Sequence, residues 1–328
     1  MTATPEDVQA KLAQAQALIT AAADEAGQLV APPPPPPAPA PLPPVVFDPD
    51  PMGWDATTAK LDPNSTVLAK DFIAYALPFG AYIAPNIAYG LIETDGSTVE
   101  YAVSTSGKPG ASGMDATIYV PAGVTGSFFN DHHLTVIDRK RGRQHDLWRT
   151  TWSGGKLTGW SGGSSIQIGQ LQQPTGTHVG SNESNLNGMA GVMTPEQVKA
   201  GDLSHPIVFA CPQPGAGANR YPAVAGDSGY TWVGHLPPAS WLRFPPGLVF
   251  PSMDAASLYL CKRIQARGMF LSDLNSSDLS FKSADLGGNL SSRAAWQAAG
   301  VTLGSTSGAY KLSSAIPWSQ LQVLAPPA

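Results

Sequence analysis

The stretch "HLTVIDRKRGRQHDLWRTTW" (residues 133–152) reads as two strands joined by a turn. Apolar and polar residues alternate in its first half, so Leu134, Val136 and Asp138 share one face of a strand. Gly142 supplies the residue whose backbone can adopt a positive φ in the turn. The stretch therefore predicts a β-hairpin.

Other segments around this hairpin also read as regular elements. We expect strands within residues 65–78, 80–94, 97–105, 116–124, 269–274 and 278–284. We expect two short helices, one over residues 194–201 with a Thr cap and a Pro in the first turn, and one over residues 254–268 between an Asp and a Gly.

Strands dominate this list, and the chain has enough glycine (34) and proline (32) for many turns. We therefore predict an all-β unit over residues 47–328: an antiparallel two-sheet β-sandwich or jelly roll with short helical insertions. Residues 153–188, rich in Gly, Ser, Asn and Gln, are expected to form a long loop region or a set of short strands.

The segment before this unit has a different character. Residues 1–30 predict a helix, with Thr4 as its cap, Pro5 in the first turn and acidic residues near its start. Its apolar residues follow a spacing of four and three, which is a heptad seam. The seam consists of Val8, Leu12, Ala15, Ile19, Ala22, Ala26 and Leu29.

Residues 31–46 form a proline-rich linker that predicts a polyproline II spacer of roughly 40 Å. Because the spacer holds the helix away from the β unit, we favour a homo-oligomeric bundle, with a trimer as the preferred state. The alternative is a helix that docks on its own domain or frays. A ligand for SH3 or WW domains is a weaker interpretation, because no Arg or Lys flanks the prolines.

Composition excludes several classes of partner. The net charge is −5 and no basic stripe exists, so we expect no nucleic-acid binding. No apolar run approaches the roughly 20 residues of a membrane helix, and the first 30 residues do not look like a secretory signal peptide. Cys211 and Cys261 can be one disulfide or two buried thiols, and they are too few for a zinc site. We expect no cofactor.

The densest cluster of polar residues lies in the hairpin. Asp131, His133 and Asp146 are candidate acid–base groups if the two strands pair. His132 and His133 point to opposite faces of a strand, so they do not share a metal ion, and we predict no metal site. The alternative is that one of these histidines is buried in the core with its hydrogen bonds satisfied, and that the other is exposed.

Trp148, Trp152 and Trp160, together with His132, are candidate ligand-binding residues beside the Gly- and Ser-rich segment. Aromatic faces next to polar side chains can stack on sugar rings and bind their hydroxyl groups. The alternative for any one of these tryptophans is core filling between two sheets. The stretch "AGDSGY" (residues 225–230) resembles the nucleophile segment of trypsin-like proteases, but no matching base segment is present, and we predict a tight turn.

Four stretches resemble, in order over residues 120–285, a family of bacterial, often secreted, β-sandwich proteins: "DHHLTVIDRKRGRQHDLW", "GMAGVMTPEQVKAGDLSHPIVFACP", "PPASWLRFPPG" and "CKRIQARGMFLSDLNSSDLSF". That resemblance implies the sandwich fold. If the resemblance extends to catalysis, the only residues to which it assigns a catalytic role are Asp131, His133, Asp138 and Asp146.

The layout of helix, Ala- and Pro-rich linker and β-rich domain resembles minor tail or tail-fibre proteins of phages that infect actinobacteria. This resemblance implies a virion protein at the tail tip or fibre, assembled in the host cytoplasm and acting outside the cell. Its helix would contact other tail proteins, and its β domain would bind host cell-envelope glycans. The alternatives are a glycan hydrolase or lyase on the same scaffold, and a cell-surface or secreted bacterial protein.

Overall fold

The computed structural model describes residues 55–85, 90–94, 100–105, 115, 117–121, 124–127, 131–153, 156–159, 164–168, 182, 184, 186–212, 219–221, 223, 236–275, 278–287, 290 and 292–326. The chain divides into two units, Met1–Val45 and Val46–Ala328, and all described residues belong to the second. The expected N-terminal helix with its seam, the linker and the turn at residues 225–230 lie outside the described residues.

The hairpin predicted from the opening stretch is confirmed. Strands β5 (Leu134–Asp138) and β6 (Arg143–Leu147) are antiparallel, and Asp138 lies opposite Arg143 next to the turn. Gly142 has a φ of +64°, the left-handed conformation that glycine adopts without steric strain.

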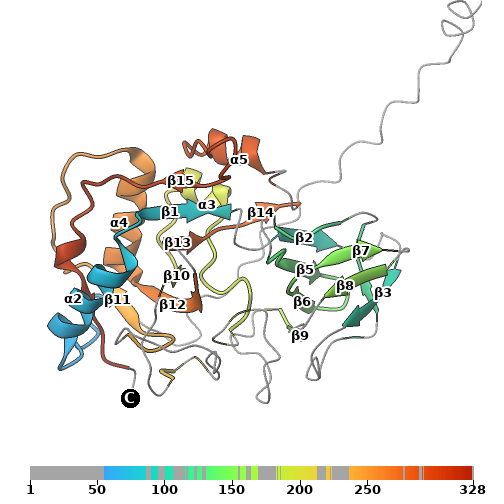
Figure 1. Cartoon of the computed structure of the whole chain (residues 1–328), viewed down its shortest axis with the longest axis horizontal. Coiled ribbons are helices and arrows are strands. Elements are labelled where there is room, and N and C mark those ends of the chain that lie inside the picture. Colours follow the sequence, from blue (N-terminus) through green and yellow to red (C-terminus); the bar gives the residue numbers. More distant parts are fainter. Residues whose placement is uncertain are drawn as a thin grey trace, which may run out of the picture. The chain divides into compact units, whose positions relative to one another are not determined.

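The hairpin belongs to a five-stranded sheet (Figure 1). In spatial order the strands are β14 (Asp285–Leu286), β2 (Gly90–Thr94), β5, β6 and β9 (Ser164–Gln167). The pairs β14–β2 and β2–β5 are parallel, whereas β6 is antiparallel to both of its neighbours.

A four-stranded sheet packs against one face of this sheet. Its strands in spatial order are β4 (Thr117–Tyr119), β3 (Glu100–Thr105), β8 (Lys156–Gly159) and β7 (Thr151–Ser153). The apolar cluster with members from both sheets consists of Ile92, Ile118, Val120, Val124, Leu134, Val136, Leu147 and Leu157. Burial of these side chains from water holds the two sheets together.

The remaining strands form a seven-stranded sheet. In spatial order they are β15 (Tyr310–Lys311), β1 (Ala81–Ala84), β13 (Leu279–Lys282), β10 (Ile207–Cys211), β12 (Met269–Leu274), β11 (Trp241–Arg243) and β16 (Gln322–Val323). The pairs β1–β13 and β10–β12 are parallel, and the other pairs are antiparallel.

The predicted β-rich fold is confirmed, but the predicted antiparallel two-sheet arrangement is wrong. The described strands form three sheets, and each sheet contains at least one parallel pair. Alternation along a strand shows which residues face the core, but it carries no information about the direction of the neighbouring strand.

The expected strand within residues 65–78 is also wrong, because this segment forms helix α2 (Ser65–Ala76). Its buried residues, including Leu68, Phe72 and Ala76, are spaced by four and therefore lie on one helical face. This spacing was visible in the sequence, but the β-branched and aromatic residues in the segment favoured a strand.

The two predicted helices are confirmed. Helix α3 (Pro195–Ala200) has a capping box between Thr194 and Gln197 and ends at Gly201 in the left-handed conformation. Helix α4 (Ala255–Arg267) begins after Asp254, whose carboxylate accepts from the backbone N–H of Ser257 (2.8 Å). Two further short elements are α5 (Arg293–Ala298) and the 3-10 helix η2 (Trp318–Gln320).

Helices α2 and α4 lie beside the seven-stranded sheet (Figure 1) and contribute to its apolar core. Phe72 of α2 packs on Phe209 of β10, with ring centroids 5.5 Å apart. Cys211 and Cys261 are both buried free thiols, so the disulfide alternative is excluded. Within the described ranges, no helix is long and apolar enough to cross a membrane.

Candidate functional site

The β5–β6 hairpin has a second face that is largely polar. Thr135 lies directly opposite Asp146, so these side chains share one face of the sheet. His133 and Gln144 are each two residues away along their strands and therefore point to the same side. All four side chains are buried, and buried polar groups require hydrogen-bond partners.

The carboxylate of Asp146 is the centre of this face. Its oxygens accept hydrogen bonds from the hydroxyl of Thr135 (2.6 Å), the amide of Gln144 (2.9 and 3.0 Å) and the backbone N–H of Gly188 (2.9 Å). These donors occupy both carboxylate oxygens, so the role of Asp146 is to hold the strands and residue 188 together.

The segment of residues 186–193, which we call the cover segment, forms hydrogen bonds with both the hairpin and the seven-stranded sheet. The side-chain amide of Gln144 also donates to the side-chain oxygen of Asn187 (2.5 Å). Further along, the backbone of the cover segment hydrogen bonds with Val208 of β10 (3.0 Å) and Lys282 of β13 (3.1 Å). The cover segment thus lies between the hairpin and the seven-stranded sheet.

His133, one of the predicted acid–base groups, is buried beside charged residues. Burial, followed by the positive charge of Lys282, lowers the pKa of His133 to about 4, although Asp273 and Asp131 act in the opposite direction. The ammonium group of Lys282 forms a salt bridge with Asp273 at 2.6 Å, and its side chain is nearly buried. His133 is therefore a neutral imidazole near an ion pair at neutral pH.

A crevice opens at this junction between the cover segment and the seven-stranded sheet, and it leaves no room for a water-sized sphere. It is lined by Asn182, Leu186, Asn187, Gly188, Ala190, Val208, Ser272 and Lys282. General acid–base catalysis requires substrate within hydrogen-bond reach of the catalytic group. This crevice would have to widen before a sugar could enter it.

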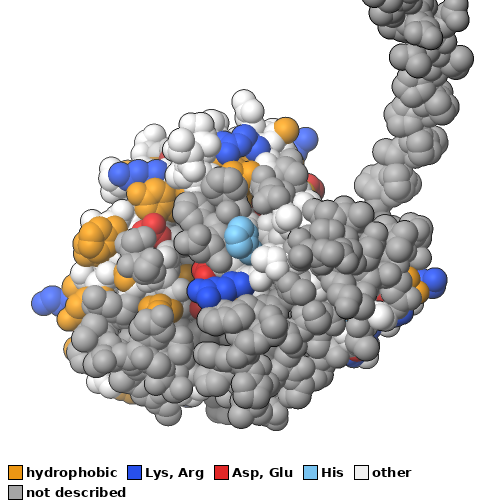
Figure 2. All heavy atoms as spheres, turned by 45° about the vertical axis from the view of Figure 1, so that its right-hand side comes forward, with side chains coloured by type: hydrophobic (Ala, Val, Ile, Leu, Met, Phe, Trp, Pro, Cys, Tyr) orange, Lys and Arg blue, Asp and Glu red, His pale blue; other side chains and the backbone are white. Residues whose placement is uncertain are grey.

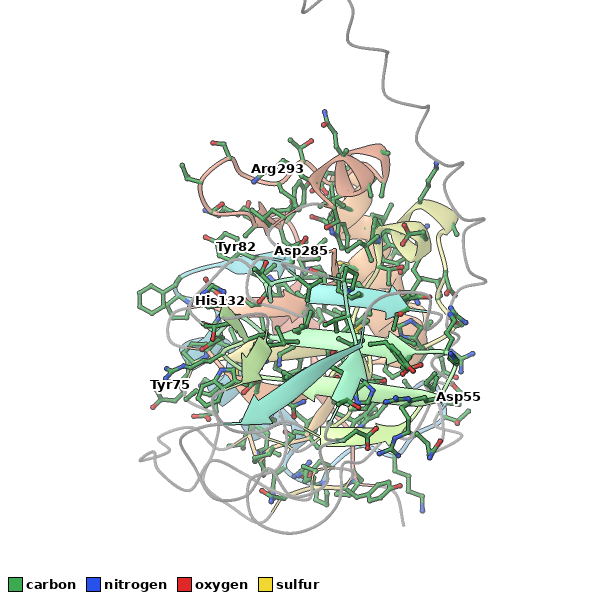
Figure 3. The ribbon with its side chains drawn as sticks, turned by 90° about the vertical axis from the view of Figure 1, so that its right-hand side faces the viewer. Asp55, Tyr75, Tyr82, His132, Asp285 and Arg293 are labelled. Carbon is green, nitrogen blue, oxygen red and sulfur yellow. The ribbon has the colours of Figure 1, made fainter. Side chains whose placement is uncertain are left out.

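The loop before β5 is held in a fixed conformation. The backbone oxygen of His133 accepts from the N–H groups of Ser127 (2.8 Å) and Gly90 (2.9 Å), and Nδ1 of His132 lies 2.8 Å from the backbone oxygen of Ser127. His132 has a φ of +39°, and a side chain at Gly126 would collide with its backbone. Consequently His132 is held at the surface, as Figure 3 shows.

Trp148 lies next to this loop and is half-buried. Its indole N–H donates to Asp131 (3.3 Å), and the guanidinium group of Arg149 lies 4.6 Å from the centre of its ring. The backbone N–H of Arg149 also donates to the backbone oxygen of Asp131 (2.7 Å). Asp131, Trp148 and Arg149 therefore form a small surface group with an acidic, an aromatic and a basic member.

The other predicted site residues divide into three kinds. Trp160 lies outside the described residues, and for Trp152 the structure describes the backbone in β7 but not the side chain. Asp138 is buried and accepts from the backbone N–H of Arg141 (3.0 Å), which stabilises the hairpin turn. Trp241 and Trp296, which were not among the predicted site residues, are buried in the core.

Sequence reasoning missed Asn187, Asp273 and Lys282, which meet the hairpin only in the folded chain. Asn187 had a weak signal, because it lies near the end of the Gly-, Ser-, Asn- and Gln-rich segment of residues 153–188, and long loops often carry function. Asp273 and Lys282 lay within predicted strands and had no signal of their own.

Among the residues that the structure describes, no group of three His, Cys, Asp or Glu side chains could hold a metal ion. Comparisons with protein-family models, curated proteins and solved structures find no match to this chain. The function is therefore argued from the residues themselves.

Replacement of Asp146 by Ala should lower the free energy of unfolding by about 3 kcal/mol or more, because it removes the acceptor of the Thr135 hydroxyl and the Gly188 N–H, and one of the two acceptor groups of Gln144. The matched control is Asp131→Ala, whose half-exposed carboxylate should contribute less than about 1 kcal/mol. Urea unfolding of both variants measures the difference, and equal losses would contradict the central role of Asp146.

Stability should fall as the pH drops from about 6.5 towards 4. Burial lowers the pKa of His133 and His145 to about 4, and that of His205 to about 3, whereas the unfolded chain protonates them near 6.5. The unfolded state therefore binds more protons in this window. As the pH falls, each histidine lowers the free energy of unfolding by about 1.4 kcal/mol per pH unit. Urea unfolding at pH 7 and pH 5 tests this, and His145→Gln should reduce the pH dependence by about one third.

Proposed function

We propose that this protein is a minor tail or tail-fibre protein of a phage that infects actinobacteria, and that its β-rich unit binds glycans of the host cell envelope. The layout of the sequence supports the placement in a tail: a heptad helix, a polyproline spacer and a β-rich domain. The virion location, the oligomer and the contact of the helix with other tail proteins all rest on this layout.

The observation that carries glycan binding is the surface group of Asp131, Trp148 and Arg149. An indole ring has two apolar faces of the size of a sugar ring; Arg149 stacks over one face of Trp148, so a sugar would stack on the opposite face, while Asp131 accepts from the indole N–H and holds the ring. Carboxylate and guanidinium groups next to the ring can accept from and donate to sugar hydroxyls. His132 lies in the same loop and adds a further polar group.

A shared helical bundle would strengthen such a weak site. Several β-rich units on one anchor face the same cell surface, so that after one unit binds, the others meet the glycan at a high effective concentration. We favour three copies.

The second candidate function is a glycan hydrolase or lyase. The observation that favours it is His133, a buried neutral imidazole near Asp131, Asp273 and Lys282, because perturbed titratable groups near charges are typical of active sites. Against this stands Asp146, whose carboxylate is already occupied by donors.

We expect the full-length protein to sediment with purified actinobacterial cell walls. Trp148→Ala should weaken this binding about tenfold, which corresponds to 1.4 kcal/mol for the loss of one aromatic contact. The control is Val249→Ser, since Val249 is 87% exposed and far along the chain from the surface group.

Two results would count against the proposal. Absence of any binding by the full-length protein would contradict glycan recognition, and release of new reducing sugar ends from the walls, abolished by His133→Ala in a folded variant, would establish the enzyme instead.

A further inference from the structure

We infer that residues Tyr75, Phe79 and Tyr82, at the end of α2 and the start of β1, form a second carbohydrate-binding surface, which we call the aromatic edge. This inference rests on the proposed glycan-binding function and adds a site that is separate from Trp148. The ligand class is a neutral sugar chain.

The rings of the aromatic edge are exposed in a way that is unusual for a fold that buries its apolar residues. Phe79 is 66% exposed and Tyr75 38% exposed, and Tyr82 is half-buried. Large aromatic side chains lose the stabilisation of burial when they remain in water. Exposed rings that gather in one place therefore indicate a surface for a ligand or partner.

The turn between α2 and β1 fixes the ring of Tyr82. The hydroxyl of Tyr82 donates to the backbone oxygen of Phe79 (3.3 Å). Gly80 has a φ of +104°, and a Cβ added there would lie 3.2 Å from the ring of Tyr82, so this ring lies over the glycine. A fixed ring loses little conformational freedom when a ligand binds.

Polar side chains accompany the rings at short range. Asp71 is four residues before Tyr75 on α2, so the two lie on the same helical face. Lys311 of β15 lies directly opposite Tyr82 of β1, and opposite residues of an antiparallel pair share a face. Each tyrosine therefore has a charged residue on its own face, Asp71 for Tyr75 and Lys311 for Tyr82.

This combination fits a sugar chain better than a second copy of the protein. A copy-to-copy interface needs a continuous apolar core, and its core is depleted of charged residues. Here an acidic residue, Asp71, and a basic residue, Lys311, share the faces of the two tyrosines. A neutral sugar chain offers apolar C–H faces to the rings and hydroxyl groups to the carboxylate and the ammonium.

The pictures agree with an accessible surface. Figure 3 labels Tyr75 and Tyr82 towards the edge of the molecule, and Figure 2 shows one face on which hydrophobic side chains lie exposed beside charged ones.

The test compares three full-length proteins: the unchanged chain, the double variant Tyr75→Ala with Phe79→Ala, and Tyr221→Ala. Tyr221 is 50% exposed on another segment and is the matched control for loss of an exposed tyrosine. The probe is purified actinobacterial cell wall, and sedimentation gives the dissociation constant. Circular dichroism and light scattering check the fold and the mass of each protein.

We expect the double variant to bind at least tenfold more weakly, with unchanged mass and fold, and the control to bind like the unchanged chain. If the unchanged chain binds and the double variant binds equally well, the aromatic edge is not the site, while the proposed function survives through Trp148. If the unchanged chain itself does not bind, the proposed function fails and the site fails with it.

A fall in mass of the double variant, with cell-wall binding retained per subunit, would identify the aromatic edge as a contact between copies and overturn the inference. If the double variant does not fold, the variant Phe79→Ser alone decides the question, because the most exposed of these side chains contributes least to the core.

Discussion

The buried carboxylate of Asp146 is the interaction on which this arrangement of sheets depends. It draws donors from both strands of the hairpin and from residue 188, which follows in the chain only after a long polar segment. A charge buried in this way destabilises the fold unless every partner is in place. The position of the cover segment, and through it the contact with β10 and β13, is therefore specified by one side chain.

This constraint has a consequence for catalysis. A carboxylate whose oxygens are all occupied cannot move protons without breaking the contact between the sheets. His133 is buried and lies near the ion pair of Lys282 and Asp273, and Lys282 lines a crevice too narrow for a sugar. Charged and aromatic groups at the surface, such as Asp131, Trp148 and Arg149, are better placed to meet an external glycan.

Local signals in the sequence predicted local structure well. The hairpin follows from alternation and Gly142, and α3 and α4 follow from their caps. Helix α2 was missed because its apolar spacing competed with strand-favouring residues, and strand direction was missed because it depends on contacts between distant segments. For the same reason Asn187, Asp273 and Lys282 had to be found in the structure, as they meet the hairpin only through tertiary contacts.

The proposed glycan binding depends on several copies of a weak site, and the heptad seam predicted over residues 1–30 is the feature that would bring copies together. The most direct measurement is the mass in solution, by light scattering, of the full-length protein and of a variant lacking residues 1–44. We expect an oligomer, with three copies favoured, for the full-length protein and a monomer for the shortened one. A monomer in both cases would contradict an anchor that multiplies the binding site.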